Sequence, residues 1–140
     1  MTNLNLLKKI CLTPGAPGYE QKIRELVIQE VTPLVDEVSI DAMGSVTALK
    51  RGKGNKKIMC AAHIDEIGFM VTHINKNGFI RFDTLGGFDA KTLTSQRVII
   101  HGKKDIIGVM GCKPVHLMKA EERGKPLPAT EYFIDTGMKK

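Results

Sequence analysis

The chain has 140 residues, 42% hydrophobic and 26% charged, with a formal net charge of +6. This composition is typical of one globular domain and excludes disordered, collagen-like and low-complexity classes. Because aromatic residues make up only 5% and the lysines are scattered, the positive charge indicates a solvated surface, and we expect no nucleic-acid partner.

Two amphipathic helices are predicted at the start of the chain. Apolar residues recur at three- and four-residue spacing over 4–11, and again from about residue 19 to residue 32. The segment between them contains two prolines and two glycines, which should end the first helix. Pro33 should end the second, because helical backbone is disfavoured in the residue before a proline.

The hydrophobic period then changes to two. Short strands are predicted at 38–40 and 46–49, around a turn at 41–44. Residues 58–62 form an unbroken apolar run, which predicts a strand covered on both faces at the centre of an α/β sheet. Cys60 in this run should therefore be a small buried residue.

The second half of the chain is predicted to be a small β module. Asn77-Gly78 is typical of a hairpin with a type I′ turn, in which both central residues have positive φ. Residues 118–128 should form a charged loop. The expected strands are residues 67–74, 79–82, 97–101, 106–110 and 131–135.

Polar residues follow the predicted central strand, where α/β folds place ligands. His63 and Asp65 are two positions apart and would share a face if the strand continued. A neutral imidazole is a good ligand for a divalent metal, and a nearby carboxylate can orient it. The alternative is a hydrogen-bonded structural histidine, since one ligand does not make a site. The remaining histidines, His73, His101 and His116, are expected to be surface or packing residues.

Residues 61–71, AAHIDEIGFMV, resemble the first metal-binding segment of the M42 metallo-aminopeptidases, which include the glutamyl aminopeptidases and the TET peptidases. The turn at 41–46 is similar to a turn of that family, with Ser45 where asparagine is usual. The likeness covers nearly the whole chain. Further similar segments, in the family's order, are residues 14–20, 77–82, 86–87, 108–111, 113–117 and 132–135.

The resemblance implies a phosphorylase/hydrolase-like mixed α/β catalytic domain with an inserted β-rich, barrel-like dimerisation domain. Residues 1–68 would belong to the catalytic domain, 69–130 to the dimerisation domain, and 131–140 to the return. The implied activity is removal of N-terminal residues from short peptides by water activated on two divalent ions, zinc or cobalt. His63 would be a metal ligand and Asp65 the catalytic aspartate that orients it. Assembly from dimers to dodecamers is also implied.

The family's remaining ligands and its general-base glutamate lie further along than this chain extends. We therefore expect an N-terminal fragment that is inactive alone, at most one metal ligand being present. The alternatives are an assembly or dimerisation module, a non-functional truncation product, or a related metallopeptidase with a His-x-Asp strand end. Neither a membrane span nor a secretion signal is recognisable. Three cysteines without C-x-x-C spacing indicate a cytoplasmic protein.

Overall fold

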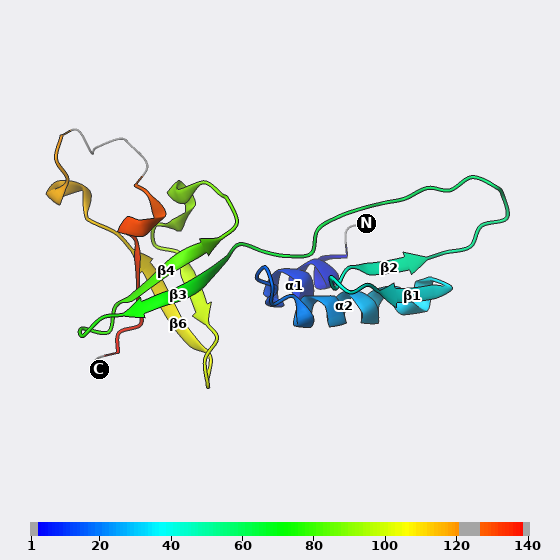
Figure 1. Ribbon diagram of the computed structural model, residues 1–140, viewed down its shortest axis with the longest axis horizontal. Coiled ribbons are helices and arrows are strands. Elements are labelled where there is room, and N and C mark those ends of the chain that lie inside the picture. Colours follow the sequence, from blue (N-terminus) through cyan, green and yellow to red (C-terminus); the bar gives the residue numbers. More distant parts are fainter. Residues whose placement is uncertain (1–2, 121–126, 139–140) are drawn as a thin grey trace. The chain divides into compact units, whose positions relative to one another are not determined.

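The computed structural model describes residues 3–120 and 127–138, which fall into two compact units, 1–68 and 69–140 (Figure 1). The first unit holds two helices and a hairpin. Its elements are α1 (Leu4–Leu12), α2 (Gln21–Val31), the 3₁₀ turn η1 (Thr32–Leu34), β1 (Glu37–Ile40) and β2 (Val46–Leu49). The strands that follow are β3 (Gly68–Ile74), β4 (Ile80–Leu85), β5 (Arg97–Ile100), β6 (Ile106–Gly111) and β7 (Phe133–Asp135), with 3₁₀ turns η2 (Ala90–Leu93), η3 (Val115–Leu117) and η4 (Ala129–Glu131).

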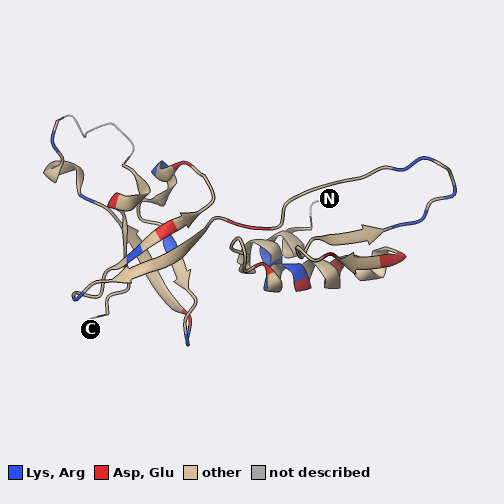
Figure 2. Cartoon of the chain, viewed as in Figure 1, with Lys and Arg blue, Asp and Glu red and all other residues tan. Residues whose placement is uncertain are grey.

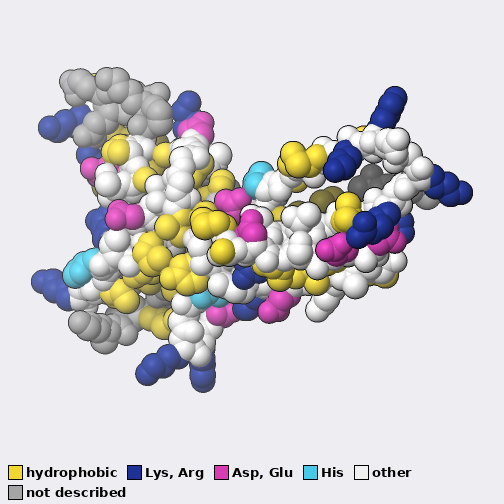
Figure 3. Space-filling view, turned by 45° about the vertical axis from the view of Figure 1, so that its right-hand side comes forward, with side chains coloured by type: hydrophobic (Ala, Val, Ile, Leu, Met, Phe, Trp, Pro, Cys, Tyr) yellow, Lys and Arg dark blue, Asp and Glu magenta, His cyan; other side chains and the backbone are white. Residues whose placement is uncertain are grey.

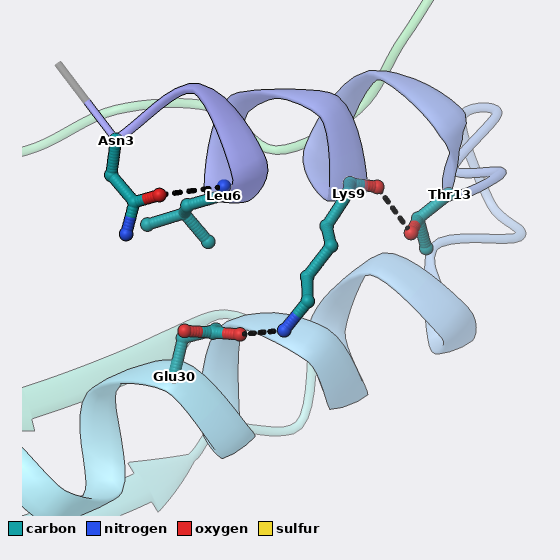
Figure 4. A network of polar contacts seen from close by, with 5 residues as sticks. All are labelled: Asn3, Leu6, Lys9, Thr13 and Glu30. Atoms are coloured by element: carbon teal, nitrogen blue, oxygen red, sulfur yellow. Dashed lines mark hydrogen bonds and ion pairs between the residues drawn. The ribbon is translucent and has the colours of Figure 1, made fainter.

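Helix α1 is capped at both ends and tied to α2 (Figure 4). The Asn3 side chain accepts a hydrogen bond of 3.1 Å from the Leu6 amide, which satisfies one of the free N–H groups of the first turn. The Thr13 hydroxyl donates to the Lys9 carbonyl at 2.7 Å. The Lys9 ammonium also pairs with Glu30 of α2 at 2.9 Å. An ion pair this exposed contributes only about 0–1 kcal/mol, so it orients the helices more than it stabilises them.

Both predicted helices are confirmed. Helix α2 ends at Val31 and passes into a 3₁₀ turn that contains Pro33. Ile23 is the only residue of α2 that is fully buried, at 3% exposure. The two helices therefore cover little apolar surface within the described part of the first unit.

The β1–β2 hairpin is held by two carboxylates at its ends. Asp41 accepts hydrogen bonds from the amides of Ser45 at 2.8 Å and Met43 at 2.9 Å. These amides, Ser45 foremost, lower the pKa of Asp41 below its ordinary 3.8. At the open end, Asp36 accepts from the Arg51 amide at 2.6 Å and pairs with Lys50 at 3.3 Å. The Arg51 amide, then Lys50, lower the pKa of Asp36 in the same way.

The predicted central strand at 58–62 is wrong for this chain. These residues have no regular structure, and Ile58 and Met59 are 90% and 88% exposed. Cys60 is exposed as well, not buried. A strand needs neighbours that take up its backbone groups, and β1 and β2 pair with each other. Among the described residues, no strand pairs with this segment. The preceding cations at 50–57 lie along the same irregular stretch (Figure 2).

The second unit is a curled five-stranded sheet in the order β3-β4-β7-β6-β5 (Figure 1). Strand β6 pairs antiparallel with β5 and with β7, and β7 pairs antiparallel with β4. Residues 133–135, which the sequence analysis placed in the return to the catalytic domain, therefore lie within this sheet. The core of the sheet consists of Ile80, Phe82, Leu93, Met110, Tyr132 and Ile134.

The strands predicted for this half are confirmed, but one turn differs. At Asn77-Gly78 only Gly78 has positive φ, at 88°, so the turn is not type I′. Instead, the Asn75 side chain accepts from the amides of Asn77 at 2.9 Å and Phe79 at 3.0 Å. This local Asx capping provides the reversal without placing Asn77 in the left-handed region. Of the loop predicted at 118–128, residues 121–126 lie outside the described residues.

No helix within residues 3–120 and 127–138 is both long and apolar enough to cross a membrane. The structure is thus of mixed α/β class, with its helices in the first unit and a curled antiparallel sheet in the second.

Candidate metal-ligand site

His63 and Asp65 lie on the irregular segment that precedes β3. The His63 side chain is 84% exposed and that of Asp65 is 41% exposed. The structure brings the two together without the extended strand that their spacing suggested. Their contact is a feature of the loop backbone.

The hydrogen bonds of His63 define which ring nitrogen carries the proton. Its Nδ1 lies 2.9 Å from Oδ1 of Asp65 and 3.1 Å from the Asp65 backbone oxygen. Both partners accept, so in the neutral ring the hydrogen sits on Nδ1 and the lone pair on Nε2. No partner for Nε2 is found among the described residues. The pair therefore presents a free imidazole nitrogen to the outside, with its tautomer fixed by a carboxylate.

The residues present fit one ligand of a metal site and not a whole site. Imidazole nitrogen is a preferred ligand of zinc and related ions, and a carboxylate behind it is the usual support. A defined coordination geometry needs three or four protein donors. Within the part of the chain that the structure describes, no three His, Cys, Asp or Glu side chains gather closely enough.

A second histidine–carboxylate pair exists, which the sequence analysis did not anticipate. Nδ1 of His101 lies 3.0 Å from Oδ1 of Asp105, across the turn between β5 and β6. The sequence could have indicated this pair, because His101 and Asp105 are four positions apart and flank the turn of a predicted hairpin. His73 and His116 are exposed on β3 and η3. His101 thus offers a chemically matched comparison for His63.

The residue after Asp65 also makes contacts that sequence spacing could not reveal. Glu66 bonds to Gly15, 51 positions earlier, through both its backbone and its side chain. A separate open hollow of about 420 Å³ in the first unit does not include His63 or Asp65. It is lined by Gly18, Glu20, Gln21, Arg24, Ile40, Asp41, Ala42, Met43 and Gly44.

Comparison with known proteins identifies the family to which the chain is similar. Residues 44–140 match the M42 glutamyl aminopeptidase family. The lysyl aminopeptidase of Pyrococcus furiosus is 39% identical over 140 residues, covering 98% of this chain and 40% of that protein. The solved TET aminopeptidase of the archaeon Thaumarchaeota archaeon SCGC AB-539-E09 is 34% identical with a TM-score of 0.84, covering 98% of this chain and 38% of the other. The Pyrococcus horikoshii TET1 peptidase has a TM-score of 0.77 at 34% identity, covering 99% and 42%.

The fold and the sequence thus resemble those of aminopeptidases. The chain belongs to the M42 family. It spans about two fifths of the length of the relatives it matches, 40% of the Pyrococcus furiosus protein for example.

Proposed function

We propose that this chain forms the N-terminal part of an M42 aminopeptidase that removes N-terminal residues from peptides with the help of two divalent ions, zinc or cobalt. Residues 1–68 would belong to its phosphorylase/hydrolase-like catalytic domain and the sheet from Phe69 onward to its dimerisation domain. The return to the catalytic domain would then follow β7. The separation of the chain into two compact units after Gly68 supports this division.

We assign His63 as a ligand of one ion through Nε2, and Asp65 as the residue that holds the ring. The observation that carries the assignment is the pair of acceptors, Asp65 Oδ1 at 2.9 Å and Asp65 O at 3.1 Å, on Nδ1 of an 84% exposed ring. When bound, the ions would supply an activated water. By accepting from Nδ1 of the neutral ring, Asp65 would leave the lone pair on Nε2 and aim it outward, and its charge would raise the ring's basicity as a ligand. Because no three His, Cys, Asp or Glu side chains gather among the described residues, the remaining ligands and the general base would have to come from elsewhere in the enzyme.

A chimera tests this function. The chain replaces the matching N-terminal portion of the Pyrococcus furiosus lysyl aminopeptidase, and circular dichroism verifies folding. Hydrolysis of an aminoacyl-nitroanilide that is abolished by a chelator and by His63→Ala, but retained in His101→Ala, supports the proposal. A folded chimera that is inactive, or one that is equally active with His63→Ala, contradicts it.

The second unit supports an assembly role, which is our second candidate function. Ile99 and Ile107 face each other across β5 and β6, and with Val109 they are 55%, 66% and 44% exposed. Alternation along the strands puts these side chains on the face opposite the core. Figure 3 shows hydrophobic side chains gathered on the surface of this unit. An exposed apolar patch of this kind is typical of a protein interface.

We infer that a second copy of the chain covers this patch. The Pyrococcus horikoshii TET1 peptidase can assemble into a tetrahedron or a large octahedral shell, which supports a homo-oligomer here. Light scattering should show a dimer or larger species that Ile107→Lys dissociates. Leu12→Lys, at a similarly exposed position of the first unit (70%), should leave the size of the oligomer unchanged. A monomer at all concentrations, or aggregates of no defined size, would favour an orphan truncation product.

We propose the cytoplasm as the setting. Cys11, Cys60 and Cys112 are all free thiols, which suits a reducing compartment. Alkylation of the protein in intact cells with a thiol reagent should modify Cys60, and a disulfide at that position would argue for an oxidising compartment.

A further inference from the structure

The segment that carries His63 lacks helix or strand hydrogen bonds of its own. A flexible segment would have to lose conformational entropy each time the ring was aimed. Some other contact must hold residues 63–66 if the His63–Asp65 geometry is to persist. The contacts of Glu66 with Gly15 meet this requirement.

Glu66 takes up both backbone groups of Gly15. The Glu66 amide donates to the Gly15 carbonyl at 2.9 Å. The Gly15 amide donates to Oε1 of Glu66, also at 2.9 Å. These two reciprocal bonds hold Glu66 against Gly15. The bond from the Gly15 amide is the stronger of the two, because its acceptor is a charged carboxylate.

The loop that receives Glu66 is itself firmly seated. Gly15 is buried, and a Cβ there would lie 2.6 Å from Cγ2 of Ile23, the buried residue of α2. On the other side of the segment, a Cβ on Gly68 would lie 2.5 Å from Cβ of Ala16. The backbone on both sides of Glu66 thus packs closely against 15–16, and side chains larger than hydrogen would separate them.

The two sets of bonds share one peptide group. The unit between Asp65 and Glu66 is trans, so its N–H and C=O point in opposite directions. Its N–H is engaged by Gly15, which turns its carbonyl toward His63, where Nδ1 donates to it at 3.1 Å. Anchoring the Glu66 amide therefore aims one of the two acceptors that fix the His63 ring.

We infer that Glu66 is a positioning residue for His63, acting through Gly15 and through the 65–66 peptide group. The inference rests on the proposed role of His63 as a ligand. Glu66 contacts neither the ring nor any atom that would react. Its part is to hold the Nδ1–H tautomer, and with it the free Nε2, in one orientation.

Ring-nitrogen NMR of the ¹⁵N-labelled chain tests the inference without metal or activity. At about pH 8.5, two units above the ordinary histidine pKa of about 6.5, the spectrum reports the tautomer of the neutral ring. Wild-type His63 should be in the Nδ1–H form. Glu66→Ala should shift it toward the mixture of an unconstrained histidine, and Glu66→Gln, which keeps an Oε1 acceptor, should restore it. The signals of His101 and the control Glu37→Ala should remain as in wild type.

An unchanged His63 tautomer in Glu66→Ala, or no restoration by Glu66→Gln, overturns the inference. If Glu66→Ala loses the amide signals of the β1–β2 hairpin, Glu66→Asp serves instead, because it withdraws the side-chain acceptor and leaves the backbone bond, as Glu66→Ala does, but also keeps the charge. If the tautomer test fails while the peptidase chimera is active, the role of Glu66 is refuted and the proposed function stands. An inactive folded chimera would refute the ligand role of His63 and leave the tautomer result intact.

Discussion

Glu66 and Gly15 are joined by two hydrogen bonds of 2.9 Å although 51 positions separate them. The loop before α2 therefore takes part in holding the segment that bears His63. A substitution in that loop, although far from His63 in sequence, should therefore alter how firmly the segment that bears His63 is held.

Gly15→Ala should loosen this segment. The added methyl would meet Ile23 at 2.6 Å, and overpacking of this kind costs about 1–3 kcal/mol. Hydrogen exchange of the Glu66 amide should quicken accordingly. Gly52→Ala is the matched control, because a Cβ there meets nothing within 4 Å. Equal exchange rates in the two variants would contradict the packing argument.

Asp65→Asn should weaken the metal site more than it weakens the fold. The variant keeps a side chain of the same shape at 2.9 Å from Nδ1 but removes its charge. Loss of such a supporting carboxylate lowers metal affinity or turnover about 10–100-fold. Zinc titration of the chimera and its kcat with an aminoacyl-nitroanilide provide the measurement. Asp105→Asn, at the matched His101 pair, should leave both quantities as in the parent chimera.

The chain by itself should not hydrolyse peptides. No cluster of three metal-binding side chains is found in the described residues, and a positioned general base is typically worth 10²–10⁴-fold in order of magnitude. The purified chain, assayed with added zinc or cobalt, should give the background rate of the nitroanilide. Turnover above that rate that a chelator abolishes would refute this expectation.

The β1–β2 hairpin should lose stability in acid. Because folding lowers the pKa of Asp36 and Asp41 below 3.8, their contribution is fully present above that pH and is lost as the pH falls through the folded-state values. Hydrogen exchange of the hairpin, measured from pH 5 downward and corrected for the intrinsic rate, should show this loss. Asp41→Asn should flatten the dependence, whereas Asp83→Asn on β4 should not. A parallel decline in all three proteins would exclude Asp41 as its cause.

Gly108→Ala should destabilise the second unit. A Cβ at Gly108 would collide with Ile134 in the core, at a cost of about 1–3 kcal/mol. Hydrogen exchange of β6 and β7, followed by mass spectrometry, should rise by the corresponding factor. Gly87→Ala, where a Cβ meets nothing within 4 Å, should have little effect. Similar hydrogen-exchange protection of β6 and β7 in both variants would show that the sheet can shift to accommodate a methyl group at Gly108.

Local sequence signals predicted most of the fold. The apolar period of α1 and α2, the stop at Pro33 and the short apolar stretches of the strands between turn signals all reside in neighbouring residues, so propensity and burial act on the same short stretch. The strand predicted at 58–62 was wrong because a run of apolar residues indicates burial, whereas a strand forms only where other strands pair with its backbone. The turn at Asn75 was missed because a side-chain acceptor replaced the backbone conformation that Asn-Gly suggests.

At the candidate site, the sequence by itself determined that an imidazole and a carboxylate stand two positions apart after an apolar run. Only the tertiary structure decided how they meet: in a loop, through Nδ1, with the 65–66 peptide group held by Gly15. The physical reason is the separation along the chain of the groups that interact. Chemical type and spacing are written in adjacent residues, but the orientation of a ring depends on which distant backbone groups satisfy the hydrogen bonds of its own segment.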